Sequence, residues 1–158
     1  MGGTWADLGA GGGVFAQALS DLLGPAGAVI AVDRDARALG RIAAPPASGA
    51  AIRTYHADFT KPLELPDLDG IPLANALHFV LRQERVLKRL VSYLKPQGRV
   101  LVVEYDNEQR SPWNPYPLPF RRFRQLAGTV GLGDVQELNR RPSLFGGREL
   151  YVAVALKP

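Results

Sequence analysis

Cysteine is absent from this chain of 158 residues. Its absence excludes disulfide frameworks, zinc ribbons, cysteine-ligated clusters and thiolate nucleophiles. Histidine is scarce as well, because His56 and His78 are the only two. A histidine-rich metal site is therefore not expected, and we predict no metal ion.

Long hydrophobic runs are also missing. No segment approaches the roughly 18–20 uninterrupted apolar residues of a membrane helix, and the first residues lack the basic and then apolar order of a secretory signal. We therefore expect no membrane span and, by default, a cytoplasmic location. The length and the apolar content of 46% predict a single domain over residues 1–158, with a core that needs no disulfide or metal.

The excess of positive charge is small and unevenly distributed. The chain has 19 basic and 15 acidic residues, which gives a net charge of +4. Between positions 110 and 148 there are seven arginines and two acidic residues, so most of the excess lies there. Such a segment can mark an anionic substrate or nucleic acid, or it can consist of solvated arginines on a helix and a hairpin. The sequence leaves these alternatives open.

Apolar periodicity predicts strands that alternate with helices. The expected strands cover residues 4–8, 28–32, 50–55, 71–77, 99–105, 134–140 and 149–156. The expected helices cover residues 14–23, 36–43, 83–94 and 120–130. Such alternation is typical of βαβ units in a mostly parallel sheet. The last two strands are joined by a turn at Gly146-Gly147, so one of them should run antiparallel to the others.

Two stretches show neither the apolar periodicity of a helix nor that of a strand. Residues 58–70 are rich in proline, aspartate and leucine, and we expect a loop or a single turn there. Residues 106–119 contain four prolines, which predict an extended segment.

A glycine-rich turn follows the first expected strand. Residues Asp7–Gly13 have the order Asp-x-Gly-x-Gly-x-Gly. Glycines let the backbone turn tightly and let a ligand approach without interference from a Cβ atom. The pattern differs from the dinucleotide fingerprint Gly-x-Gly-x-x-Gly, because Val14 stands where its last glycine would be. Asp33 ends the second expected strand, where a carboxylate can accept both hydroxyls of a ribose. The alternatives are a plain connecting turn and, for Asp33, a helix cap.

Five segments, in this order, resemble the motifs of class I S-adenosylmethionine-dependent methyltransferases. They are Asp7–Gly13, Asp33, Ala57-Asp58-Phe59, Asn75-Ala76-Leu77-His78 and Leu94–Leu101. The last is similar to the family's LKPGG segment before the fifth strand, with Gln97 in place of the first glycine. The resemblance implies an α/β fold with a doubly wound, Rossmann-like sheet of seven strands. The strand order would be 3-2-1-4-5-7-6, with strand 7 antiparallel.

The resemblance also implies that S-adenosylmethionine is the cofactor. Gly9, Gly11 and Gly13 would line its methionine and ribose parts. Asp7 would meet its amino group, directly or through water.

The adenosine part of the cofactor would meet residues that follow the second and third strands. Asp33 would bind the ribose hydroxyls, and Arg34 would flank the adenine. Asp58 would accept a hydrogen bond from the adenine amino group, with Phe59 beside the ring. After the fourth strand, the carbonyl of Asn75 would face the amino group of the cofactor.

The chain departs from the family in two places. Relatives usually carry helices before the first strand, and these form a lid, whereas here the glycine-rich turn begins at residue 9. The stretch 58–70 is too short and too rich in proline for a full helix. Both losses should uncover part of the sheet, and a homo-oligomer or another partner would bury it. The alternative is a monomer in which residues 106–119 fold back as a lid.

Methyl transfer is an in-line displacement at a carbon that the sulfonium already activates. The protein mainly aligns the reactants and excludes water, and a base helps only when the nucleophile must lose a proton. His78 and Tyr105 are the catalytic candidates, with Asp106 beside them, although a structural hydrogen bond is an equal alternative for His78. Trp113, Tyr116 and Phe120 are expected either to border the acceptor or only to cover the sheet. These three side chains are flat and apolar, and they lie in or next to the proline-rich segment 106–119, which its prolines stiffen.

Several acceptor classes are disfavoured. Cytosine-C5 and arsenic methylation, as those families perform it, need cysteine, and residues 75–78 lack the Pro-Pro-aromatic motif of enzymes that methylate amino groups of nucleic acids. We expect a small-molecule acceptor, as in the group that includes quinone-biosynthesis C-methyltransferases, and no nucleic acid. The alternative is a non-catalytic module or partner subunit that binds S-adenosylmethionine or S-adenosylhomocysteine without turnover.

Overall fold

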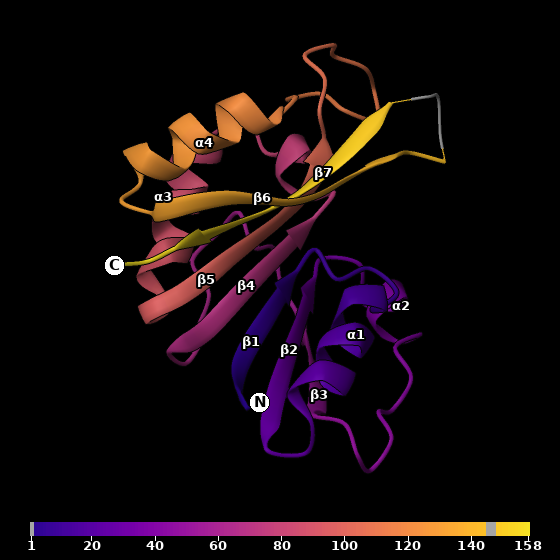
Figure 1. Ribbon diagram of the computed structural model, residues 1–158. Helices are drawn as coiled ribbons and strands as arrows, with labels where there is room; N and C mark the ends of the chain where they lie inside the picture. The colour runs from indigo at the N-terminus through magenta and orange to yellow at the C-terminus, as the bar shows by residue number, and fades with distance from the viewer. Residues whose placement is uncertain (1, 145–147) are drawn as a thin grey trace.

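The computed structural model describes residues 2–144 and 148–158 (Figure 1). Its seven strands are β1 (Gly3–Leu8), β2 (Gly27–Asp33), β3 (Ala51–His56), β4 (Leu68–Ala74), β5 (Leu94–Tyr105), β6 (Gly133–Pro142) and β7 (Glu149–Leu156). Its helices are α1 (Val14–Leu23), α2 (Ala36–Leu39), α3 (Gln83–Ser92) and α4 (Phe120–Thr129), with a short 3-10 turn η1 (Leu77–Phe79).

The strands form one mixed sheet of order β3-β2-β1-β4-β5-β7-β6. The first five strands pair in parallel, and β7 runs antiparallel to both β5 and β6. The expected strand order and the direction of strand 7 are therefore confirmed. The expected turn at Gly146-Gly147 lies outside the described residues.

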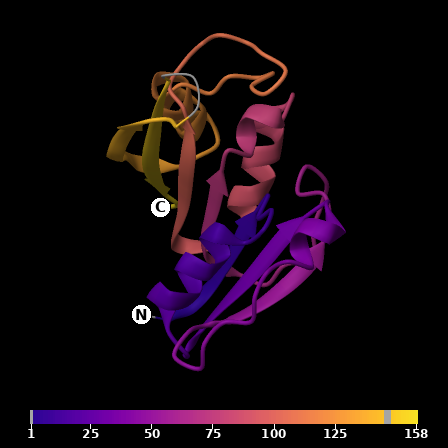
Figure 2. The same ribbon diagram turned by 90° about the vertical axis from the view of Figure 1, so that its right-hand side faces the viewer.

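Helices lie on both faces of the sheet (Figures 1 and 2). α1 and α2 pack on one face over β1, β2 and β3, and α3 and α4 pack on the other face. The α3 and α4 side holds the larger core, which includes Leu8, Leu73, Leu87, Val102 and Phe123, all fully buried. Strands that are apolar on both faces need this double cover.

The face of the sheet opposite α3 and α4 is thinly covered over β5 and β7. Along β5, Val100 and Val102 are fully buried against α3 and α4, whereas the alternating Leu101 and Val103 are only half-buried. On the outer face of α1, Leu22 is 65% exposed. None of the described helices is long and apolar enough to cross a membrane.

The strands β1 and β4 are neighbours in the middle of the sheet. They pair in register at one position only, Trp5 with Gly70. Glycine is required there, because a Cβ atom on Gly70 would lie 2.3 Å from the Trp5 ring. The opening between the carboxyl ends of these strands is where open α/β sheets bind ligands.

Two expected helix ends are wrong. The helix expected over 36–43 ends at Leu39, because the next N–H groups bond three residues back, Arg41 to Ala38 and Ile42 to Leu39. Such bonds tighten the chain into a turn and end the helix. The helix expected over 83–94 ends at Ser92, since β5 already begins at Leu94.

Two expected strands are also misplaced. The strand expected over 71–77 covers 68–74, because Asn75 takes a positive φ of 50° and the chain then enters η1. The strand expected over 99–105 begins five residues earlier. Gln97, with a φ of 64°, makes a bulge within it, and its N–H still bonds to the carbonyl of Lys157.

The two irregular stretches behave as expected. Residues 57–67, all of which are described, contain no helix and lead directly into β4. Residues 106–119 lack regular structure except for a bridge between Ser111 and Asn114. This segment, orange in Figure 2, arches over the end of the sheet near the start of α3.

Candidate functional site

The glycine-rich turn between β1 and α1 depends on left-handed backbone conformations. Gly9, Gly11 and Gly13 have φ values of 80°, 52° and 84°. Residues with a side chain adopt these values only under strain. The N–H groups of Gly9 and Ala10 both donate to the carbonyl of Val32, at 2.9 and 3.0 Å, which wraps the turn around the end of β2. The turn is therefore shaped by glycine conformations and by hydrogen bonds to the end of β2.

Asp7 is a buried carboxylate at the end of β1. It is 2% exposed, and its Oδ2 atom accepts no hydrogen bond within the described residues. Burial raises its pKa to about 7, with a further contribution from the charge of Asp33, while the N–H of Ala16 opposes the shift. An unsatisfied buried acceptor of this kind calls for a donor, and a cationic amino group supplies one.

Asp33 is held in place by backbone groups. Its Oδ2 accepts from the N–H of Gly11 at 2.8 Å, and its Oδ1 accepts from the N–H of Asp35 at 2.8 Å. The helix-capping role belongs instead to Asp35, which accepts from the N–H groups of Arg37 and Ala38. The carboxylate of Asp33 is therefore free to orient a ligand rather than to cap α2.

Asp58 lies just after β3. Its Oδ1 accepts from the backbone N–H of Thr60 at 2.9 Å and from the Thr60 hydroxyl at 2.7 Å. Burial alone would raise the pKa of Asp58, but these bonds and the charges of Lys61 and Arg34 hold it below its usual range. Asp58 therefore remains an ionised acceptor near neutral pH.

Asn75 ends β4 at the other side of the opening. Its N–H donates to the carbonyl of Val103 at 2.8 Å, which fixes the end of β4 against β5. A Cβ atom on Gly9 would lie 3.0 Å from the Cβ of Ala76, so the glycine-rich turn and the end of β4 meet closely.

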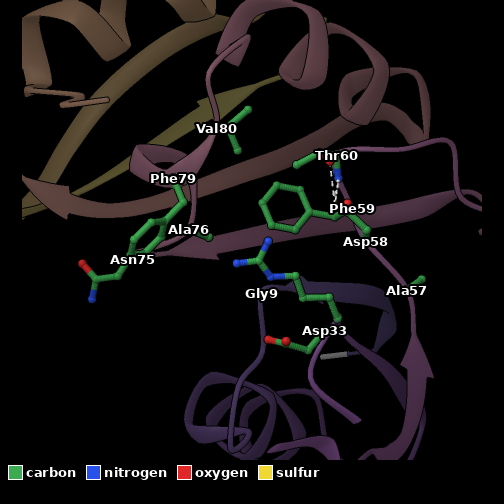
Figure 3. Close-up of a pocket in the computed structure, with 11 residues that line it drawn as sticks. Gly9, Asp33, Ala57, Asp58, Phe59, Thr60, Asn75, Ala76, Phe79 and Val80 are labelled. Carbon is green, nitrogen blue, oxygen red and sulfur yellow. Dashed lines mark hydrogen bonds between the residues drawn. The ribbon is translucent and has the colours of Figure 1, made fainter. Parts of the chain in front are cut away.

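These strand ends enclose a cavity of about 290 Å³ (Figure 3). Six of the nine expected cofactor residues line it: Gly9, Asp33, Arg34, Asp58, Phe59 and Asn75. In Figure 3 the Asp33 carboxylate lies across the cavity from the Phe59 ring, and Asn75 and Phe79 stand at one end. The lining has both carboxylates and aromatic faces, as a site for a polar molecule with a flat ring would need.

The lining of the cavity differs from the expected set of cofactor residues in two ways. Asp7, Gly11 and Gly13 are outside the lining of this cavity. Thr60, Phe79 and Val80 line it, although sequence reasoning did not select them. The signal for Thr60 was its position two residues after Asp58, where a hydroxyl bonds the carboxylate. The last two reach the cavity only because η1 turns the chain after β4.

His78 is buried beside this cavity and does not line it. It is 2% exposed, and its Nδ1 lies 2.5 Å from Oε2 of Glu104, which is fully buried. The other carboxylate oxygen, Oε1, accepts from the N–H groups of Leu77 and His78 at 2.9 and 3.2 Å. The Tyr105 ring centroid lies 5.9 Å from that of His78. Glu104 was missed, although an acidic residue inside an apolar strand signals a buried carboxylate with partners.

The expected acceptor residues lie in or after the proline-rich segment. Trp113 is 79% exposed, and the N–H of Tyr116 donates to the carbonyl of His78 at 2.9 Å. Phe120 packs on Tyr151, with ring centroids 5.5 Å apart. Tyr116 therefore lies next to η1, whereas Phe120 contributes to the core.

Asp106 and Gln83 hold this segment in place. Asp106 accepts from the N–H of Phe120 at 2.9 Å and pairs with Arg140. Burial alone would raise the pKa of Asp106, but Arg140 and the Phe120 N–H hold it low, so it is a poor base near pH 7. Gln83, which the sequence also did not single out, donates to the carbonyls of both Leu77 and Tyr116.

Within residues 2–144 and 148–158, no group of three or more His, Asp or Glu side chains is placed to hold a metal ion.

Known proteins resemble this chain in sequence and in fold. Residues 6–98 match the family model described as a methyltransferase domain. Comparison with curated protein sequences gives no match. Among solved structures, the YcgJ protein from Bacillus subtilis is similar, with a TM-score of 0.75 and 16% identity, over 99% of this chain and 92% of that chain.

Two further structures show the same architecture. One is an arsenic(III) S-adenosylmethionine methyltransferase from Chlamydomonas reinhardtii, with a TM-score of 0.78 and 18% identity, over 98% of this chain and 63% of that one. The other is magnesium protoporphyrin IX methyltransferase from Synechocystis PCC 6803 with bound S-adenosylmethionine. Its TM-score is 0.74 and its identity 14%, over 99% of this chain and 71% of that one. At such identities the likeness concerns the fold.

Proposed function

The chain belongs to the methyltransferase-domain family, with the fold of the class I S-adenosylmethionine-dependent enzymes, and we propose that it transfers a methyl group to a small-molecule acceptor. The observation that carries this proposal is the cavity at the ends of β1 to β4, where Asp33, Asp58 and Asn75 converge. When bound, S-adenosylmethionine supplies a methyl carbon that its sulfonium makes electrophilic.

The residues around the cavity fit the adenosine part of this cofactor. Asp33, oriented by the N–H of Gly11, accepts hydrogen bonds from the ribose hydroxyls. Asp58 accepts from the adenine amino group, and Phe59 and Arg34 lie beside the ring plane. The ionised state of Asp58 suits it to this accepting role.

The amino-acid part of the cofactor fits the other end of the site. Asp7 has one buried oxygen without a donor, and the cofactor's ammonium group provides that donor. Gly9, Gly11 and Gly13 let the backbone approach without side chains. The carbonyl of Asn75 faces the same ammonium group.

The acceptor lies, in this proposal, between η1 and the proline-rich segment. Trp113 and Tyr116 offer flat apolar surface there, and Phe120 supports them from the core. Glu104 accepts the hydrogen bond of His78 through Nδ1, which assigns the proton to Nδ1 and leaves Nε2 as the proton acceptor. Tyr105 stands beside the same imidazole. His78 and Tyr105 are the groups that we propose to take a proton from an acceptor whose nucleophile carries one, and His78, which is 2% exposed, is the less accessible of the two.

The lack of cysteine narrows the acceptor class. Arsenic(III) binds thiolates, and this chain has none, so the likeness to the Chlamydomonas enzyme does not extend to its substrate. We propose a carbon, nitrogen or oxygen nucleophile on a small molecule, as in the quinone-biosynthesis group. We further propose that the protein acts in the cytoplasm.

A two-part experiment tests this function. Calorimetry should detect saturable binding of S-adenosylhomocysteine and no binding of NAD. Incubation with isotopically labelled S-adenosylmethionine and a panel of phenols, quinols, amines and carboxylic acids should label at least one acceptor. A preference for NAD would refute the class, and cofactor binding with no labelled product would assign a non-catalytic binding module instead.

A further inference from the structure

A second hollow adjoins the cavity and is not used by the proposed reaction. It has a volume of about 560 Å³ and lies between the connection from β3 to β4 and the start of α3. Arg34, Thr60, Phe79 and Val80 line both hollows, so the two share a wall. We call it the basic groove, after the five basic residues that line it: Arg34, Lys61, Arg82, Arg85 and Arg89.

The basic groove carries positive charge from two sides. Arg85 and Arg89 are four residues apart and lie on one face of α3, and Arg82 is the residue that caps the start of this helix. Arg34 directly follows β2, and Lys61 belongs to the connection from β3 to β4. Among the described residues, no acidic side chain lines the groove. The groove therefore focuses a positive potential next to the cavity.

Four of these cations have no anionic partner. Arg34, Lys61, Arg82 and Arg85 are exposed, and in the part of the chain that the structure describes no carboxylate lies within 4.0 Å of their charged groups. The nearby Asp58 carboxylate feels the charges of Arg34 and Lys61 but is bonded to Thr60. Like charges gathered in this way repel one another, and a bound anion would relieve that repulsion.

Arg89 differs from the other four because it builds the groove. Its Nη2 donates to the carbonyls of Thr60 at 2.5 Å and of Phe59 at 3.4 Å. These bonds tie the connection between β3 and β4 to α3. The shape of the groove is therefore set by internal contacts before any ligand arrives.

The basic groove also has apolar surface. Phe79 is 51% exposed and Leu81 is 69% exposed, and Pro62 and Val86 complete this side. A volume of several hundred Å³ with apolar walls and a few convergent charges is typical of a small-molecule site. The lining includes no residue of the 106–119 segment in the described chain, although it shares Phe79 of η1 with the side that we assign to the acceptor.

We propose that the basic groove is a second binding site, which takes a small molecule that combines an oxyanion group, phosphate or carboxylate, with an apolar body. Guanidinium groups pair with both oxyanions in a bidentate geometry. The apolar body lies against Leu81 and Phe79. The proposal does not depend on methyl transfer, because the charge and shape of the groove are present without the cofactor.

The test is a titration of the full chain, without cofactor, by NMR or calorimetry. The probes are phenyl phosphate, benzoate and inorganic phosphate. We expect saturable binding, with phenyl phosphate at least threefold tighter than inorganic phosphate because of its ring. The order of phenyl phosphate and benzoate distinguishes a phosphate from a carboxylate ligand.

A pair of double variants locates the site. Arg82→Gln with Arg85→Gln should weaken the binding of phenyl phosphate at least tenfold. Arg99→Gln with Arg124→Gln removes the same charge from exposed positions outside the groove and should leave binding unchanged. Equal weakening in both double variants would mean attraction by net charge alone and would overturn the proposal.

Two further outcomes also decide the matter. Absence of saturable binding for all three probes, or binding of a DNA oligonucleotide but of none of them, would overturn a small-molecule site. Leu81→Ala should remove the advantage of phenyl phosphate over inorganic phosphate. Thermal unfolding checks that the double variant of Arg82 and Arg85 is folded. If it is not folded, Lys61→Gln replaces it, and this single variant should weaken the binding of phenyl phosphate by a smaller factor.

Discussion

Glu104 and His78 form a buried pair, with Oε2 of the carboxylate 2.5 Å from Nδ1 of the imidazole. The same carboxylate accepts the backbone N–H groups of Leu77 and His78, so one side chain of β5 holds the whole start of η1. Phe79 and Val80, the next residues, line the cavity. Glu104 is therefore a positioning residue for one wall of the cofactor site.

Replacement of this carboxylate should destabilise the fold strongly. Glu104→Ala leaves the imidazole and two backbone N–H groups without their acceptor, at a cost of about 3–5 kcal/mol of unfolding free energy. Denaturant unfolding measures it. Glu108→Ala is the matched control, because Glu108 pairs with Arg121 at an exposed site, and its loss should cost below about 1 kcal/mol. Equal effects of the two substitutions would contradict the positioning role.

Asp33→Ala should weaken the binding of S-adenosylhomocysteine by about 1–3 kcal/mol, the usual cost of a lost hydrogen bond to a charged group. Calorimetry gives the value. Asp35→Ala is the control, since this neighbouring carboxylate caps α2 and should affect stability rather than affinity. An unchanged affinity in Asp33→Ala would refute the assignment of the ribose site.

Asp7 should make both stability and cofactor affinity depend on pH. Its pKa is about 7 in the folded chain, above the unfolded value of 3.8, so the folded state holds a proton that the unfolded state has lost between these values. Stability without cofactor should therefore fall as pH rises from about 4 to about 7. Asp7→Asn should remove this decline, as denaturant unfolding at several pH values would show.

The cofactor's ammonium group favours the ionised form of Asp7. Binding of S-adenosylhomocysteine near pH 6 should therefore release a proton, and affinity should rise with pH up to about 7. Calorimetry in two buffers of different ionisation enthalpy counts the proton. The proton release should be absent in Asp7→Asn, and its persistence there would exclude Asp7 as the source.

Trp113→Ala and Tyr116→Ala should raise the KM for the acceptor while the affinity for S-adenosylhomocysteine stays unchanged. The reason is that, in our proposal, these rings border the acceptor, and neither of them lines the cofactor cavity. Leu138→Ala, an exposed apolar position on β6, serves as the control. Unchanged acceptor kinetics in both aromatic variants would assign these rings to covering the sheet.

Self-association should bury the exposed apolar face of α1. Val14 and Leu22 are 78% and 65% exposed, and Phe15 is 39% exposed, which is unusual for a soluble monomer when such residues are contiguous. Light scattering across a concentration series should show a mass above 17 kDa, and Leu22→Glu should return it to that value. A wild-type mass of 17 kDa at all concentrations, with cofactor bound, would contradict self-association.

Local patterns were enough for much of the fold. The alternation of apolar runs predicts a mostly parallel sheet, the family resemblance supplies the strand order, and both agree with the observed sheet. Predicted boundaries failed where a single residue changed the backbone. Asn75 ends β4 and Gln97 makes a bulge within β5, both with positive φ, and neither conformation is signalled by residue type as it would be at a glycine.

Six of the nine cofactor residues expected from the sequence and the family resemblance line the cavity. Asp33, Asp58 and Asn75 follow consecutive strand ends, and the carboxyl ends of parallel strands meet at one edge of the sheet. The Glu104–His78 pair and the basic groove, in contrast, could be recognised only from the tertiary structure. Glu104 lies 26 residues from His78, and Lys61, in the connection between β3 and β4, lines the same groove as arginines of α3. Local periodicity cannot register such partners, because their contact depends on how separate elements pack together.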